Sequence, residues 1–301
     1  MSTLKPGEGY LMALADILRS KDFLVLAEME TPKGVNLSDF VENARHIKGR
    51  VDAVLIPDMA YAIMRLSAMA GAVVLKEQGL EAIVQFSCRD RNRLALQGDL
   101  LGAQVLGLGA VMAVEGRPIE MGDHLKAKPV HDLDVPGFME AVAALNQGQD
   151  LGGKELNGTP RILAGVRLEP WVDKAQAKVR LAEAKQAVDK GAAFVITPPV
   201  FDPGDFASFM EEAKELGVPV FASVMLLKSV GMARYMNQNL PGVNISEDVI
   251  RRIRMASDRT GECVKIAGET VAELRKACQG VLLVTTGWEN RMPEILSSAG
   301  M

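Results

Sequence analysis

The chain has 301 residues, a formal net charge of −4 at neutral pH and 48% hydrophobic residues. This length suits one large domain or two modest ones, and the hydrophobic share is ample for a core of that size. The slightly acidic balance gives no basic footprint for nucleic acid, so we expect no nucleic-acid partner. The apolar runs are too short for a membrane-spanning helix, so we expect no membrane partner.

The cysteines and histidines indicate neither a metal site nor a disulfide framework. Cys88, Cys263 and Cys278 show no CxxC spacing, and the three histidines are scattered along the chain. Such a sparse, odd set argues against a structural zinc site, and we expect no metal. Residues 1–20 lack the apolar centre and cleavage site of a signal peptide. These features predict a protein of a reducing compartment, the cytoplasm.

Short apolar runs recur along the whole chain and are separated by longer segments with helical periodicity. The runs predict eight strands, at Phe23–Glu28, Ala53–Ile56, Ala82–Phe86, Ala110–Val114, Ile162–Val166, Phe194–Ile196, Val218–Ala222 and Val281–Val284. Continuous apolar character is typical of strands that are buried on both faces. Their alternation with helices indicates a parallel α/β fold.

The segments between the runs predict helices. Ser38–Ile47 opens with a serine in a capping position, and Lys174–Lys190 ends at Gly191, a natural C-cap. The other helical segments in chain order are Asn92–Leu106, Asp205–Leu216 (which ends at Gly217), and 229–239, 246–258 and 262–278. The last three form an extra helical insertion before the final strand.

Eight strand–helix units favour a closed (β/α)8 barrel, the TIM barrel, over an open doubly wound sheet. No GxGxxG follows the first strand, which weakens the dinucleotide-binding alternative. We expect a single barrel domain over residues 1–301, with 1–22 as an N-terminal helical extension. The amphipathic part of that extension, Tyr10–Leu18, would cover the lower end of the barrel or mediate contacts between copies of the chain. Active sites of such barrels lie at the carboxyl ends of the strands.

The first strand ends on an acidic residue. Glu28 is the last apolar-run position, so its carboxyl group should be partly buried in the mouth of the barrel. Burial raises the pKa of a carboxylic acid, and a raised pKa suits a general acid near neutral pH. A solvated loop residue is the alternative reading. Glu30 is expected to be exposed.

Polar residues crowd the end of the third strand. The segment Gln85–Asn92 reads QFSCRDRN and enters the following helix, whose N-terminus favours anionic ligands. Asp90 is equally explained as a helix cap with Arg89 or Arg91 as its ion-pair partner. Cys88 has no neighbouring histidine to activate it as a nucleophile.

Two further strand ends carry candidate contacts. Gly116, before Arg117, allows close approach of the backbone to a ligand. After the sixth strand, Thr197 precedes a pair of prolines, and Phe201 would either stack on a flat ring or close the top of the barrel.

Several segments resemble the methylenetetrahydrofolate reductase family. Residues 88–92 with 100–103 are similar to its CRDRN…LLGA segment, and 27–34 to its first-strand E-x-x-P-P-K-G motif. Residues 191–202 resemble G-A-x-F-x-x-T-Q-x-x-F-D. Later landmarks are 241–243 and 287–289. The segments keep their order and cover nearly the whole chain.

The resemblance implies a flavin-containing (β/α)8 barrel that reduces 5,10-methylene-tetrahydrofolate to 5-methyl-tetrahydrofolate in one-carbon metabolism and methionine biosynthesis. Glu28 takes the place of the family's catalytic glutamate, which assists protonation so that the methylene bridge opens. The implied cofactor is FAD, with FMN as the alternative. The implied partners are the tetrahydrofolate substrate and NAD(P)H or an electron-donor subunit, and self-association stays open. The residues assigned to the cofactor are Asp58, Gln85, Cys88, Gly116 and Arg117. Those assigned to the substrate are Thr197 and Phe201.

Four departures from the family pattern fall at positions that face ligands. Pro198 replaces the family's glutamine, and Arg117 replaces an aspartate. Pro57 replaces a threonine that meets the flavin, and Gln186-Ala187 replaces a basic pair. The departures remove polar partners while the scaffold motifs persist.

Three functions are therefore compatible with the sequence. The first is a flavin-dependent reductase, and the second is a flavin-free relative that binds folate or scaffolds a one-carbon enzyme complex. The third, a barrel methyltransferase that uses methyl-tetrahydrofolate, has no corrinoid or zinc-thiolate motif in its support.

Overall fold

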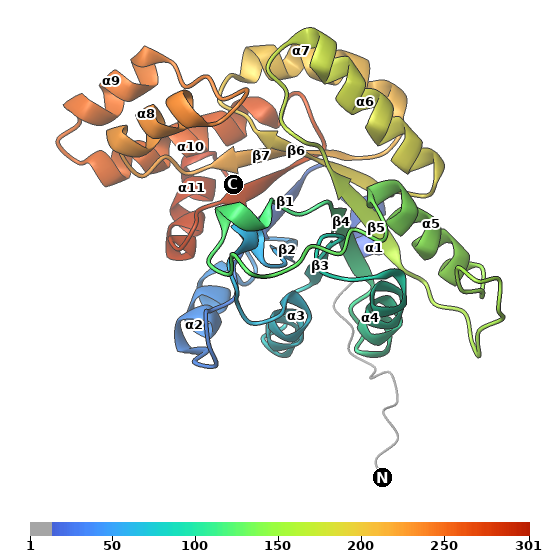
Figure 1. Ribbon diagram of the computed structural model, residues 1–301. Coiled ribbons are helices and arrows are strands. Elements are labelled where there is room, and N and C mark those ends of the chain that lie inside the picture. The colour runs from blue at the N-terminus through green and yellow to red at the C-terminus, as the bar shows by residue number, and fades with distance from the viewer. Residues whose placement is uncertain (1–13) are drawn as a thin grey trace.

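The computed structural model describes residues 14–301 and shows eight parallel strands that close into a barrel in chain order (Figure 1). The last strand pairs with the first along its whole length. The strands are β1 (Leu24–Glu28), β2 (Ala53–Ile56), β3 (Ala82–Ser87), β4 (Ala110–Val114), β5 (Leu163–Arg167), β6 (Phe194–Pro199), β7 (Val220–Met225) and β8 (Gly280–Val284). The predicted (β/α)8 barrel is confirmed, and each observed strand overlaps the run that predicted it.

Helices surround the barrel on all sides (Figure 1). They are α1 (Leu14–Ser20), α2 (Ser38–Ile47), α3 (Ala68–Glu77), α4 (Arg93–Val105), α5 (Val135–Asn146), α6 (Lys174–Asp189), α7 (Pro203–Ala213), α8 (Val230–Asn239), α9 (Glu247–Met255), α10 (Arg259–Leu274) and α11 (Met292–Ser298). The extra helices before the last strand, α8 and α9, precede α10 as predicted. The serine cap of α2 is wrong: the cap position is Leu37, and Ser38 is the first helical residue.

Side chains from alternating strand positions fill the inside of the barrel. Phe194 and Phe221 are fully buried there, with ring centroids 5.9 Å apart in an edge-to-face arrangement. Glycines leave room for both rings. A Cβ on Gly165 would lie 2.2 Å from the Phe194 ring, and one on Gly280 would lie 2.6 Å from the Phe221 ring. Large and small residues therefore interdigitate, as dense core packing requires.

Helix α1 closes the amino end of the barrel. Leu14 and Ile17 are buried in the same cluster as the inward-facing strand residues Leu24 and Leu26. The part of the predicted N-terminal extension from residue 14 thus covers the lower end of the barrel. The rest of the extension, including Tyr10, lies outside the described residues. Within 14–301, no helix is both long and apolar enough to cross a lipid bilayer.

Candidate functional site

Polar side chains replace apolar ones at the carboxyl end of the barrel. Successive strand residues face opposite sides of the sheet, so the inward row that begins with Leu24 and Leu26 ends on Glu28. By the same alternation, the polar residues at the mouth of the barrel include Gln85 and Ser87 on β3, Arg167 on β5 and Ser223 on β7. A ligand at this mouth would meet these side chains first.

Glu28 and Arg167 form an ion pair at the mouth, between strands β1 and β5. The Arg167 guanidinium donates from Nη2 to Glu28 Oε2 at 2.7 Å. The two side chains are 28% and 15% exposed, so the pair is largely withdrawn from solvent but can be reached from the mouth. The arginine thereby holds the carboxylate of Glu28 in one orientation. The sequence predicted a partly buried Glu28 but not this partner.

On the strands at the mouth, three buried polar atoms have no hydrogen-bond partner among residues 14–301: Gln85 Oε1, Ser87 Oγ and Arg167 Nε. Burying a polar group without a partner costs about 1–3 kcal/mol. Native structures therefore pair nearly all such groups with protein, water or a ligand. Their clustering at the carboxyl ends of β3 and β5 marks this mouth as the place where a polar ligand edge would bind.

Glu30 is half-buried, which corrects the expectation that it is exposed. Its carboxylate pairs with Arg65 at 2.7 Å. Burial raises the pKa of Glu30, Arg65 opposes that shift, and the negative charges of Glu28 and Glu289 add to it. Lys228 lies close enough to oppose it as well. The side of the mouth between β1 and β8 therefore holds a second set of interacting charges.

Asp58 is fully engaged by its own chain. The carboxylate is 2% exposed, accepts a hydrogen bond from the Ser87 backbone N–H at 3.1 Å and pairs with Arg91. Arg91 in turn contacts Asp99 at 2.9 Å. Asp58 therefore ties the ends of β2 and β3 together, and its assignment to a cofactor stays a prediction.

Arg89 and Gly116 join the loops after β3 and β4. The Arg89 guanidinium is 2% exposed, pairs with Asp90 and donates to the Arg117 carbonyl at 2.7 Å. Gly116 has a φ of +92°, and a Cβ there would lie 2.4 Å from Ser87 Oγ. The space beside the Gly116 backbone, predicted to admit a ligand, is therefore occupied by the side chains of Ser87 and Arg89. Arg117 points to the rim, where it is half-exposed and contacts Glu169 at 3.4 Å.

Two other predicted contacts face away from the mouth. Cys88 is fully buried in the layer between the strands and the helices, and burial raises the pKa of its thiol to about 12. Thr197 follows the inward-facing Ile196 and is also fully buried. Its carbonyl accepts from Ser223 Oγ at 2.6 Å. The structure does not bring the Cys88 and Thr197 side chains to Glu28.

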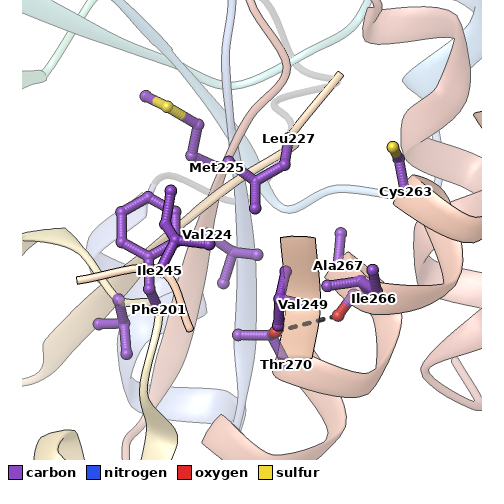
Figure 2. Close-up of a pocket in the computed structure, with 11 residues that line it drawn as sticks. Phe201, Val224, Met225, Leu227, Ile245, Val249, Cys263, Ile266, Ala267 and Thr270 are labelled. Atoms are coloured by element: carbon purple, nitrogen blue, oxygen red, sulfur yellow. Dashed lines mark hydrogen bonds between the residues drawn. The ribbon is translucent and has the colours of Figure 1, made fainter. Parts of the chain in front are cut away.

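Phe201 lies in the apolar wall between β7 and the helices α9 and α10. Figure 2 shows its ring among aliphatic side chains, and the small pocket there is also lined by Val224, Ile245 and Ile266. Thr270 donates its hydroxyl hydrogen to the Ile266 carbonyl at 3.0 Å. Phe201 therefore packs in the apolar layer between the strands and the helices, and its assignment to the substrate stays a prediction.

The four departures from the family pattern fall in two places. Pro57 and Pro198 follow the inward residues Leu55 and Ile196 at alternate positions, so they contribute no polar side chain to the mouth. Arg117 is at the rim. Gln186 and Ala187 lie near the end of α6, which runs back to the amino end of the barrel. A ligand centred on Glu28 would have to extend along the outside of the barrel to reach that pair.

Sequence reasoning missed Arg167, although a signal was present. It directly follows the apolar run that predicted β5, so the rule that strand ends carry the site applies to it as it does to Glu28. In the part of the chain that the structure describes, no group of three or more histidine, cysteine or acidic side chains is arranged to hold a metal ion.

An eight-stranded parallel barrel with a Glu–Arg pair at the carboxyl ends of its strands defines a (β/α)8 protein. The model of the methylenetetrahydrofolate reductase family matches residues 13–300, and the chain belongs to this family. No curated protein matches the chain in sequence.

Solved structures share the fold at low sequence identity. One is an uncharacterized protein from Clostridium thermocellum that binds two copies of 5-methyl-5,6,7,8-tetrahydrofolic acid (TM-score 0.67, 13% identity, 96% of this chain and 100% of that one). Others are the EDTA monooxygenase from Chelativorans sp. BNC1 (0.56, 11%, 92% and 94%) and a riboflavin lyase with modified FMN and riboflavin (0.55, 9%, 93% and 92%). At these identities the likeness shows the shared barrel fold alone.

Proposed function

We propose that this chain binds a reduced folate at the mouth of the barrel and, with a flavin, reduces 5,10-methylene-tetrahydrofolate to 5-methyl-tetrahydrofolate. The observation that carries the proposal is the position of Glu28. It is the inward-facing end of β1, where the family places its catalytic glutamate, and it lies in a mouth with unpartnered polar atoms. The folate-binding protein of the same fold supports the choice of ligand.

The mouth fits the ring of a flavin better than its phosphate end. Gln85 Oε1 and Ser87 Oγ are buried polar atoms without partners in residues 14–301, and they match the hydrogen-bonding edge of a fused heterocyclic ring. A phosphate group needs a cation or a helix N-terminus. Arg117 is the half-exposed cation at the rim, so it is the residue proposed to meet the phosphate end. Whether the cofactor is FAD or FMN depends on how far the ligand extends beyond Arg117.

Glu28 would act as the general acid of the reaction. Because its Oε2 accepts from Arg167, proton transfer would use Oε1. A proton passed from Oε1 to a bridge nitrogen breaks the bond between that nitrogen and the methylene carbon, and the iminium left behind can accept hydride. Arg167 fixes the orientation of the carboxylate through this step. The flavin, when bound, supplies the hydride, with NAD(P)H or a partner subunit as the proposed source of electrons.

The visible spectrum of the purified chain, with and without added FAD or FMN, tests the cofactor. Flavin absorbance that stays with the protein through gel filtration is the expected result. Single-turnover kinetics then test the reaction without knowledge of the electron donor. The flavin-loaded chain is reduced chemically under anaerobic conditions and mixed with 5,10-methylene-tetrahydrofolate, and return of the oxidised flavin band reports hydride transfer.

The Glu28→Gln variant tests the acid–base role. Loss of a positioned proton donor lowers the single-turnover rate about 10²- to 10⁴-fold. Glu215→Gln, at an exposed acid in the short helix at Lys214–Leu216, is the matched control and keeps the wild-type rate. An unchanged rate in Glu28→Gln would remove this residue from the mechanism.

The second candidate function is a flavin-free relative that binds folate or scaffolds a one-carbon enzyme complex. The observation in its favour is the pair Pro57 and Pro198, which puts two positions without hydrogen-bond donors into the ring of residues around the mouth. This candidate predicts tight folate binding with no retained flavin and no gain when flavin is added. Retained flavin, or reduction of methylene-tetrahydrofolate by the isolated chain, would eliminate it.

A further inference from the structure

The loop between β2 and α3 contains a strained arch, residues 59–62. Met59, Tyr61 and Ala62 have φ angles of 47°, 55° and 58°. A left-handed conformation costs a residue with a side chain about 1–2 kcal/mol. Strain of this kind persists only where the surroundings enforce it, and it concentrates at ligand clamps and active sites.

Contacts from two other loops hold the arch in place. Arg89 Nη2, from the end of β3, donates to the Met59 carbonyl at 3.4 Å. Gly122, in the loop after β4, lies so close that an added Cβ would be 1.9 Å from the Ala62 carbonyl oxygen. Asp123, the next residue, accepts from the Met64 backbone N–H at 3.1 Å and pairs with Lys33. Figure 1 shows this green segment between β4 and α5 crossing the carboxyl end of the barrel.

The arch leaves the side chain of Tyr61 half-exposed, at 49%. Burial of the remaining part raises the pKa of its phenol, the charge of Glu28 adds to the shift, and Arg117 and Arg167 oppose it. The phenol therefore lies within the electrostatic reach of the Glu28–Arg167 pair and stays neutral at physiological pH. Packing does not explain the cost of the arch, because an aromatic ring that contributed to the core would be buried.

Inside the mouth, β3 presents two buried polar atoms that lack partners in the described chain, Gln85 Oε1 and Ser87 Oγ. Gln85 is 5% exposed and Ser87 is fully buried. They belong to the inward row of the strand whose end also supplies Arg89, the residue that anchors the arch. The end of β3 therefore carries the polar edge formed by Gln85 and Ser87, and through Arg89 it also anchors the arch that bears the Tyr61 ring.

We infer that Tyr61 is the outer wall of a slot for a fused pyrimidinone ring, whose face it covers and whose amide edge meets Gln85 and Ser87. Two rings share this chemistry: the pterin of a reduced folate and the isoalloxazine of a flavin. The inference rests on the proposed function for the identity of these two candidates, and it adds the residue that selects them. Stacking on a ring face is the interaction that a half-exposed aromatic side chain at a mouth provides.

Binding titrations of three variants of the full chain test the role of the ring. Tyr61→Phe keeps the aromatic face, whereas Tyr61→Leu keeps apolar volume and loses it. Tyr235→Leu, at a 62% exposed tyrosine on α8, is the matched control. The probes are 5-methyl-tetrahydrofolate, 6-methyltetrahydropterin (which lacks the tail), p-aminobenzoylglutamate (which lacks the pterin) and FMN, each measured by calorimetry.

The expected result is that Tyr61→Leu weakens binding of at least one ring probe about 10-fold or more, the range of aromatic stacking on a base. Tyr61→Phe and Tyr235→Leu stay within about threefold of wild type on the same scale. Binding of the pterin-free fragment is unchanged by Tyr61→Leu. The ring probe that responds identifies which of the two rings the slot holds.

A second pair of variants tests the arch itself. Gly122→Ala forces the Ala62 carbonyl to move, so it should weaken ring binding as Tyr61→Leu does although it adds only one methyl group. Gly102→Ala, on the open surface of α4 with no neighbour within 4 Å of an added Cβ, is the control and binds like wild type. Thermal melts followed by circular dichroism confirm that both variants fold.

The outcomes separate this inference from the proposed function. Wild-type folate binding that is insensitive to Tyr61→Leu and Gly122→Ala overturns the inference and leaves the function standing. Tyr61-dependent binding of FMN without any folate binding supports the slot and removes the folate substrate. A wild-type chain that binds none of the ring probes at millimolar concentration overturns both.

Discussion

The two ends of the barrel interior are built from opposite kinds of residue. At the amino end, Leu14 and Ile17 of α1 close an interior that is apolar throughout. At the carboxyl end, the same inward rows finish on Glu28, Ser87 and Arg167, with polar atoms left unpartnered in residues 14–301. The first arrangement favours stability, and the second carries a desolvation cost that a ligand can offset. Substitutions at the two ends should therefore have separable effects.

The largest expected effect comes from the apolar interior. Phe194→Ala removes a fully buried ring that packs edge-to-face on Phe221. Phenylalanine-to-alanine changes in cores lower the free energy of unfolding by about 3–5 kcal/mol. Urea denaturation measures the loss, and calorimetry of folate or flavin should show unchanged affinity in the folded variant. Equal losses of affinity and stability would show that the two ends are not separable.

At the mouth, Arg167→Met should affect the reaction rate and lower the stability of the fold less than Phe194→Ala does. Removing a hydrogen bond to a charged group is expected to slow single-turnover reduction about 10- to 100-fold. The free energy of unfolding should fall by about 1–3 kcal/mol, less than for Phe194→Ala, because the largely buried carboxylate of Glu28 loses its partner but is still reached by water from the mouth.

Arg167→Lys is the control for this variant. It keeps the charge but loses the rigid fork of donors, so it should recover part of the rate. A large loss of stability in Arg167→Met with a normal rate would assign the pair to the fold rather than to the site.

The contrast between the ends also explains what the sequence could predict. Continuous apolar runs specify strands buried on both faces, so β2 and β4 coincide with their predicted ranges. Glu28 was found because a charge at the end of such a run is conspicuous. Cys88 and Phe201 were assigned by position in a motif, and the structure shows their side chains in the outer apolar layer. A motif gives order along the chain, whereas the alternation of strand residues decides which side they face.

Other parts of the mouth had no signal in the sequence. The arch at residues 59–62 depends on three left-handed residues that are not glycine, and no local pattern predicts that conformation. The raised pKa of Glu30 depends on its burial and on the charges of Arg65 and Glu289, the latter far along the chain. Such contacts between loops follow only once the barrel has brought the strand ends together.

Gly165→Ala tests how tightly the apolar interior is packed. Its Cβ would lie 2.2 Å from the Phe194 ring, so the ring must move. Overpacking of this kind costs about 1–3 kcal/mol in the free energy of unfolding. The double variant Gly165→Ala/Phe194→Leu should then be more stable than the sum of the single changes predicts, because the smaller side chain makes room. Strict additivity in urea denaturation would contradict the interdigitated packing.

Glu30 gives the mouth a pH-dependent contribution to stability. Burial raises its pKa above 4.5, with Glu28 and Glu289 adding to the shift and Arg65 and Lys228 opposing it. An acid whose pKa is raised in the folded state stabilises the protein at pH values below its ordinary pKa. That contribution is lost as the pH rises through the pKa of the folded state.

The stability of wild type relative to Glu30→Gln should therefore fall as the pH rises from the ordinary pKa of 4.5 through the raised pKa of the folded state. Urea denaturation at several pH values measures the difference, which is expected to be smaller than the effects above. A difference that grows with pH would mean that Arg65 outweighs burial.

The smallest effect tests whether the mouth carries backbone strain that the rest of the barrel avoids. Ala62 has a φ of 58°, and Ala62→Gly removes the methyl group that makes this conformation unfavourable. The gain of about 1–2 kcal/mol is partly offset by the greater freedom of glycine in the unfolded chain, about 0.5–1 kcal/mol. We expect a net stabilisation of about 0–1.5 kcal/mol. Ala60→Gly, in the same arch but without a positive φ, should instead destabilise by about 0.5–1 kcal/mol. If both variants lose stability equally, the left-handed arch is not under strain, and the argument that its cost is retained for a ligand loses its basis.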